Sequence, residues 1–139
     1  MKRILVAHDG SDLSDKALLM ALEMAECFGA CLFLLTVVPE LYFDEPDGDS
    51  HEEIMREALD KARDSLKRVG QGINRPGLDV RTMVRHGSPE KKIIEAARRM
   101  KVDLVVVGSH GRHGASRILL GSISTSVVNS APCPVLVVR

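Results

Sequence analysis

Apolar residues along this chain occur in two alternating patterns, short continuous runs and longer segments with helical spacing. Largely apolar runs occupy residues 3–7, 31–38, 103–107 and 135–139, and such runs are typical of strands covered on both faces of a parallel sheet. Residues 79–85 alternate apolar with polar side chains instead, which indicates a half-exposed strand at a sheet edge. The pattern therefore predicts five strands.

Four helices are predicted between these strands. Ser11 is a suitable N-cap for the first helix, which extends to about Phe28. Ser50 and Glu53 have the spacing of a capping box for the second helix, and the glycines and proline within residues 70–77 would close it.

Ser88 followed by Pro89 predicts the start of the third helix, and Gly121 with Ser122 the start of the fourth. Strands that alternate with helices imply right-handed crossovers and a parallel sheet with helices on both faces. We therefore expect a single α/β domain over residues 1–139, with a doubly wound, Rossmann-like sheet of five strands in the order 3-2-1-4-5. Ligands of such folds bind at the switch point, here between the first and fourth strands, outside their carboxyl ends.

The fourth strand leads directly into a glycine-rich connection that reaches the last helix. Its glycines are Gly108, Gly111, Gly114 and Gly121. Glycine lets backbone N–H groups approach a ligand without a Cβ in the way, and a helix start adds unpaired N–H donors and a positive dipole end. The segment therefore predicts a phosphate site. The alternative is that the glycines only form turns, but connections of this length are usually functional.

Several other kinds of nucleotide-binding and hydrolase site are not expected, because the sequence lacks their motifs. The sequence has no GxxxxGK[ST], no GxGxxG after the first strand, no GxSxG and no HExxH. Phosphoryl transfer needs charge neutralisation and a positioned nucleophile, and the chain offers no P-loop lysine for it. A Walker-type enzyme, a dinucleotide-binding protein and a serine hydrolase are therefore not expected.

The composition argues against nucleic-acid and membrane partners. Nineteen basic and nineteen acidic residues cancel, and four aromatic residues offer no base-stacking platform, so we expect no nucleic-acid partner. No apolar run approaches the roughly 18–20 residues of a membrane span. The three cysteines form no CxxC pair and no signal peptide precedes them, so we expect a cytoplasmic protein whose cysteines are small core residues.

The glycine-rich connection also carries a resemblance. GSHG, nine residues, then GS, together with the ending APCPVLVVR, resemble the ATP-binding branch of the universal stress protein family. The VAHDGS start and the TVVP segment are similar too, so the resemblance spans the whole chain. It implies a domain of the adenine nucleotide alpha hydrolase-like type that binds ATP, ADP or AMP, with or without Mg²⁺, as a homodimeric stress-response module.

The resemblance also assigns residues to the nucleotide. One group would line the ribose and the first phosphates: Gly108, Ser109, His110 and Gly111. A second group would hold the later phosphates through backbone N–H groups and hydroxyls: Gly121, Ser122, Ile123 and Ser124. Asp9 would lie near the sugar or a phosphate-bound metal, and the Val37 backbone would read the adenine edge. Ala7 stands where some members have proline.

Other roles stay open for some of these residues. Asp9 also suits capping of the first helix together with Ser11. Arg112 and Arg117 either pair with phosphate oxygens or remain solvated. Three histidines invite a metal or general-base hypothesis, but no fixed local spacing supports it, so no metal ligands are assigned: His8, His110 and His113.

The last strand is apolar throughout, yet the expected order leaves it at a free edge, which proteins usually blunt or pair. Pairing across a two-fold axis would remove the edge in both copies, so we expect a homodimer through Pro134–Arg139, unless the preceding loop covers the edge. Three functions follow: a nucleotide-binding regulator, a slow Mg²⁺-dependent ATPase or phosphoryl or nucleotidyl transferase, and a structural dimer with an empty loop. The intact glycine motif favours the first and argues against the third.

Overall fold

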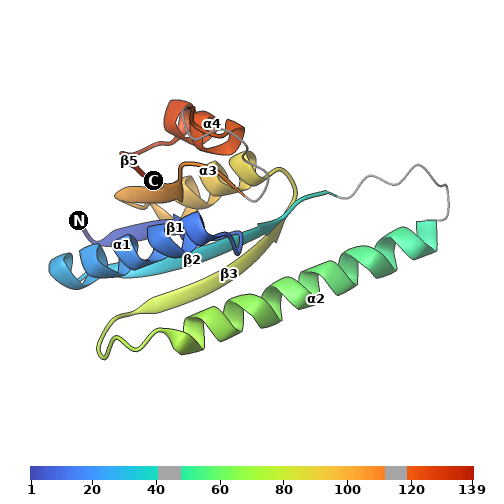
Figure 1. The fold of residues 1–139 in the computed structure, drawn as a ribbon, viewed down its shortest axis with the longest axis horizontal. Coiled ribbons are helices and arrows are strands. Elements are labelled where there is room, and N and C mark those ends of the chain that lie inside the picture. Colours follow the sequence, from blue (N-terminus) through green and yellow to red (C-terminus); the bar gives the residue numbers. More distant parts are fainter. Residues whose placement is uncertain (41–47, 112–118) are drawn as a thin grey trace.

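Strands and helices alternate strictly along the chain, as expected. The computed structural model describes residues 1–40, 48–111 and 119–139. Its elements are β1 (Arg3–Ala7), α1 (Asp12–Phe28), β2 (Cys31–Val38), α2 (Gly48–Gly72), β3 (Val80–His86), α3 (Pro89–Met100), β4 (Leu104–Gly108), α4 (Ser122–Ser130) and β5 (Val135–Val138). All strand pairs are parallel and their order is β3-β2-β1-β4-β5 (Figure 1). The predicted doubly wound α/β fold is therefore confirmed.

The central strands are buried because helices cover both faces of the sheet. Ile4 and Val6 of β1 pack with α1 and with Leu66 of α2. Leu5 between them faces the other side, where α3 and Val127 of α4 pack. Alternate residues of one strand thus enter two separate cores, which is why the run is continuously apolar.

Most element bounds lie within one residue of the predicted ones, but α2 differs at its start. The helix begins at Gly48, so Ser50 lies inside its first turn and the predicted capping box is wrong. Gly70 does not close the helix either: it lies where α2 packs on β3, and a Cβ there would lie 3.2 Å from Thr82 Cγ2.

The expectation that the cysteines are core residues is wrong for Cys27, which is exposed, while Cys31 and Cys133 are half-buried. Cys27 lies on the outer side of α1, because Leu22 and Ala25 occupy the side that faces the sheet. Burial raises the pKa of the Cys31 and Cys133 thiols. Both are therefore poor thiolate nucleophiles at neutral pH.

Asp103, just before β4, ties that strand to the start of β1. Its Oδ2 accepts the Lys2 N–H at 2.7 Å and the Arg3 N–H at 2.9 Å. These two backbone hydrogen bonds hold the pKa of the Asp103 carboxyl below its ordinary value of 3.8. Because the folded pKa is the lower one, the carboxylate stabilises the fold above the unfolded pKa, and this stabilisation is lost as pH falls through the folded pKa.

We therefore expect Asp103→Asn to lower the urea midpoint at pH 7 and to have less effect as pH falls toward about 2, well below the ordinary pKa of an aspartate. Urea unfolding of both proteins at several pH values measures the difference. Asp64→Asn, on the exposed face of α2, is the control and should leave the midpoint nearly unchanged. A deficit that stays constant from pH 7 to pH 2 would contradict the electrostatic explanation.

Candidate functional site

The carboxyl ends of β1 and β4 meet at the centre of the sheet. Val6 of β1 is opposite Val106 of β4 in the register, so the segments that follow the two strands leave the sheet side by side. They stay close beyond it, because a Cβ on Gly111 would lie 3.0 Å from Asp9 Oδ2. The fold thus brings together the acidic turn after β1 and the first part of the glycine-rich connection.

Gly108, the last residue of β4, packs closely against α1. A Cβ at this position would lie 3.2 Å from both the carbonyl carbon and the Cβ of Leu13. The end of β4 therefore passes directly against the first turn of α1. This contact with Leu13 is not readable from the sequence, because it joins residues that are far apart in the chain.

The Ser109 carbonyl joins the two ends of the glycine-rich connection. It accepts the Gly121 N–H and the Ser124 hydroxyl, both at 2.8 Å. The Ser109 N–H donates to the Val138 carbonyl at 2.7 Å and extends the pairing of β4 with β5. Two of the backbone amides assigned to the phosphates, and the buried Ser124 hydroxyl, are therefore engaged within the protein.

The start of α4 has backbone N–H donors that no intrahelical acceptor binds. Gly121 is the N-cap and has no side chain with which to accept a hydrogen bond. The N–H groups of the first helical turn, on Ser122, Ile123 and Ser124, have no acceptor inside the helix. They lie at the positive end of the helix dipole, next to the end of β4, where an anion is favoured.

Asp9 has the predicted capping role. Its Oδ1 accepts the Ser11 N–H at 2.9 Å and also the Ser11 hydroxyl. The Ser11 Oγ in turn accepts the Ser14 N–H at 3.2 Å as the N-cap of α1. The second carboxylate oxygen, Oδ2, is the one that lies beside Gly111, so capping leaves that side of Asp9 directed at the glycine-rich connection.

Of the three histidines considered for a metal or base role, His8 and His110 lie among the described residues, and each contacts a different neighbour. His8 is buried, and its Nε2 lies 2.8 Å from Asp15 Oδ1 of α1. The sequence shows only that the first turn of α1 carries acidic residues, so the pairing of His8 with Asp15 was not predicted. The His110 Nδ1 lies 3.0 Å from Ser109 Oγ, and its buried Nε2 has no hydrogen-bond partner among the described residues.

The remaining assigned residues fall into two groups. Val37 and Ala7 are half-buried near the carboxyl ends of β2 and β1. Arg112, Arg117 and His113 lie outside the described residues. Within residues 1–40, 48–111 and 119–139, no group of three or more His, Cys, Asp or Glu side chains is placed to hold a metal ion, and none of the helices is long and apolar enough to cross a membrane.

The fold defines a doubly wound α/β protein whose switch point lies between β1 and β4. The family model of the universal stress protein family matches residues 1–139, and the chain belongs to this family. A universal stress protein of Methanocaldococcus jannaschii is 35% identical over 139 residues, which cover 99% of this chain and 82% of the relative.

Solved structures agree with this membership. A universal stress protein from Lactobacillus plantarum superposes with a TM-score of 0.89 at 29% identity, over 99% of this chain and 97% of that one. A universal stress protein crystallised in complex with cAMP superposes with a TM-score of 0.63 at 30% identity, over 99% of this chain and 96% of that one. The fold and the family are thus shown, and one similar protein binds an adenine nucleotide.

Proposed function

We propose that this universal stress protein belongs to the ATP-binding branch, binds an adenine nucleotide, foremost ATP, between β1 and β4, and acts as a stress-response regulatory module. The observation that carries the proposal is the start of α4, where Ser122, Ile123 and Ser124 present backbone N–H groups at the carboxyl edge of the sheet. The similar protein in complex with cAMP supports an adenine nucleotide as the ligand.

The His110 side chain adds a hydrogen-bond donor on the β4 side of the proposed crevice between β1 and β4. In the tautomer in which the Ser109 hydroxyl donates to Nδ1, the His110 Nε2 carries the proton. A buried polar group without a partner costs about 1–3 kcal/mol, and a phosphate or ribose oxygen would supply the missing acceptor. Gly111 beside it lies close to Asp9, because a Cβ there would be 3.0 Å from Oδ2, and the Asp9 carboxylate suits a phosphate-bound Mg²⁺.

We assign the binding of the adenine base to the backbone of Val37. Along β2, Cys31 donates to Lys2 beside β1 and Leu32 donates to Asp79 beside β3, so successive residues face opposite neighbours. By this alternation Val37 faces β1, but β1 ends at Ala7, which is opposite Leu35. The Val37 N–H and C=O therefore extend past the end of β1 and suit the donor and acceptor edge of adenine.

We propose binding rather than turnover as the main activity. Phosphoryl transfer is accelerated by cations on the transferred group and by a positioned base. Among the described residues assigned to the crevice, no lysine or arginine occurs, so any hydrolysis would be slow and would depend on Mg²⁺. The half-buried or exposed free cysteines fit the reducing cytoplasm, where we place the protein.

One experiment distinguishes a nucleotide-binding regulator from a slow ATPase or transferase and from a structural dimer without nucleotide. The purified protein is denatured, and the supernatant is analysed by anion exchange; we expect co-purified ATP and a rise in melting temperature when ATP is added to the emptied protein. ADP that accumulates with time in the presence of Mg²⁺ would instead indicate an ATPase. No co-purified nucleotide and no thermal shift with ATP, ADP, AMP or cAMP would leave a structural dimer and overturn the proposal.

A further inference from the structure

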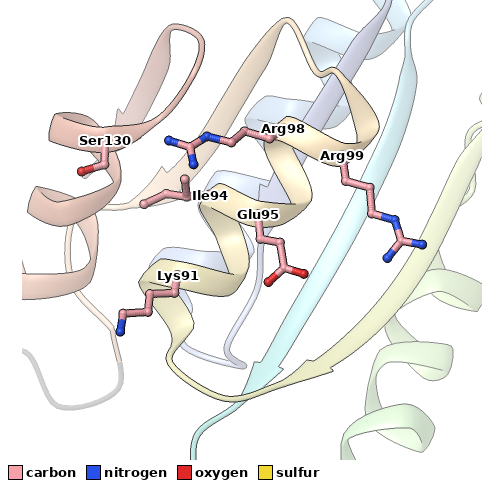
Figure 2. Close-up of a pocket in the computed structure, with 6 residues that line it drawn as sticks. All are labelled: Lys91, Ile94, Glu95, Arg98, Arg99 and Ser130. Atoms are coloured by element: carbon pink, nitrogen blue, oxygen red, sulfur yellow. The ribbon is translucent and has the colours of Figure 1, made fainter.

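A hollow of about 640 Å³ lies between α3 and α4, where none of the assigned nucleotide residues occurs. Its volume is within the range of about 300–1,000 Å³ that ligand sites occupy. It is lined by Lys91, Ile94, Glu95, Arg98, Arg99 and Ser130 (Figure 2). The sequence analysis did not predict it, since it depends on how two helices that are far apart in the chain pack together.

One face of α3 forms the floor of the hollow. Lys91, Ile94 and Arg98 follow one another at helical spacing and extend on the side of α3 that faces α4 (Figure 2). Ile94 is half-buried and lies between the two cations. Ser130, at the end of α4, lines the hollow on the opposite side (Figure 2).

The charge in the hollow is positive and largely uncompensated. Glu95 is its one acidic residue, and Lys92 Nζ binds that carboxylate at 3.0 Å. This hydrogen bond lowers the pKa of Glu95. Within the described residues the side chains of Lys91, Arg98 and Arg99 make no salt bridge or hydrogen bond, and Arg99 interacts with Glu95 only through its charge. Because the whole chain has a formal net charge of zero, this is a local concentration of positive charge that favours a negative ligand.

We propose that this hollow docks an extended acidic segment of a partner protein, with an apolar residue between two acidic ones. Lys91 and Arg98 are seven residues apart, or about 10 Å along the helix axis. In an extended peptide, alternate side chains point the same way, and residues i and i+4 lie about 13 Å apart. The pattern acidic–x–apolar–x–acidic therefore places two carboxylates near Lys91 and Arg98 and an apolar side chain on Ile94.

Other anions fit this hollow less well. A free phosphate is too small to reach both cations, and it leaves the apolar Ile94 without a partner. Single-stranded nucleic acid binds through aromatic stacking as well as charge, and no aromatic side chain lines the hollow. The acidic peptide is the ligand that uses the cations and the apolar floor together. Its docking does not depend on the nucleotide site.

The proposal is tested with a fluorescein-labelled peptide that contains Glu-Thr-Leu-Thr-Glu, titrated with the full chain and followed by fluorescence anisotropy. We expect saturable binding that weakens as KCl rises, because the ion pairs are exposed and screened. Arg98→Glu and Lys91→Glu should each weaken binding at least about tenfold, in line with the cost of an unfavourable charge contact. Both residues are exposed, so circular dichroism should show an unchanged fold.

Two matched controls define the site. Lys61→Glu, an equally exposed change on α2, should leave the affinity unchanged, and replacing the peptide leucine with serine should weaken binding to the native protein. Equal losses for Lys61→Glu and Arg98→Glu would show only a general charge effect and would overturn the proposal. Competition by millimolar phosphate, or tighter binding of an oligothymidine to the same residues, would also overturn it in favour of those ligands.

Discussion

Replacing Gly121 with valine is expected to abolish ATP binding while the sheet stays folded. The Cβ would lie 3.2 Å from the Ser109 carbonyl oxygen and 3.4 Å from Ser124 Oγ, so the added side chain would crowd the space between Ser109 and the start of α4. The crowding should cost about 1–3 kcal/mol of stability. The ligand effect is the larger one, because a Cβ-branched side chain blocks the approach of phosphate to backbone donors.

Differential scanning fluorimetry with ATP measures this loss. At ATP concentrations of about 100 Kd, binding stabilises the native state by about 2.7 kcal/mol, which corresponds to a rise of about 8 °C for a domain of this size. Gly121→Val should show no such rise, and Gly121→Ala should show a reduced one. Gly72→Ala is the control, because nothing lies within 4 Å of a Cβ there, and it should respond to ATP like the native protein.

An unchanged ATP affinity in folded Gly121→Val would remove the start of α4 from the phosphate site. The structure also makes the role of the segment more specific than the sequence did. The Gly121 N–H and the Ser124 hydroxyl both bind the Ser109 carbonyl, so they hold the two described ends of the connection together. In the proposed site, the first-turn N–H groups would then be the remaining backbone donors of this segment, and Gly121 would let a phosphate reach them.

The fold was predictable because its signals are local and its assembly rules are strict. A continuous apolar run such as residues 31–38 indicates a strand covered on both faces. Right-handed crossovers then leave few orders for five strands. The start of α2 was not predictable in the same way, since Ser50 and Glu53 match a capping box but the helix already begins at Gly48.

The candidate site was predictable only in outline. The glycine spacing marked the segment, but it did not distinguish Gly108, which packs closely against Leu13, from Gly121, which borders the helix start. Nor did it indicate that His8 pairs with Asp15 on α1 while His110 keeps an unpaired Nε2 among the described residues. These differences arise from contacts between distant parts of the chain, and single-sequence patterns do not contain them.

A change in the edge strand β5 is expected to have a large effect on dimer formation. The Pro134 and Val138 carbonyls accept hydrogen bonds from Val105 and Ser109, so alternate residues of β5 face β4. Val137 lies between two such residues and directs its N–H to the free edge. We propose that this edge pairs with the same strand of a second copy, because two-fold pairing satisfies the exposed N–H and C=O groups of both.

Val137→Pro should therefore convert the dimer to a monomer and keep the fold, because proline is tolerated in an edge strand where its missing N–H faced outward. Loss of two symmetric hydrogen bonds at about 1–1.5 kcal/mol each weakens the dimer about 100-fold. Light scattering coupled to size exclusion measures the mass. The matched control is Leu136→Pro, one residue earlier, whose N–H faces β4: it should destabilise the fold itself. A Val137→Pro protein that stays dimeric, or a native protein that is monomeric at high concentration, would contradict pairing through β5.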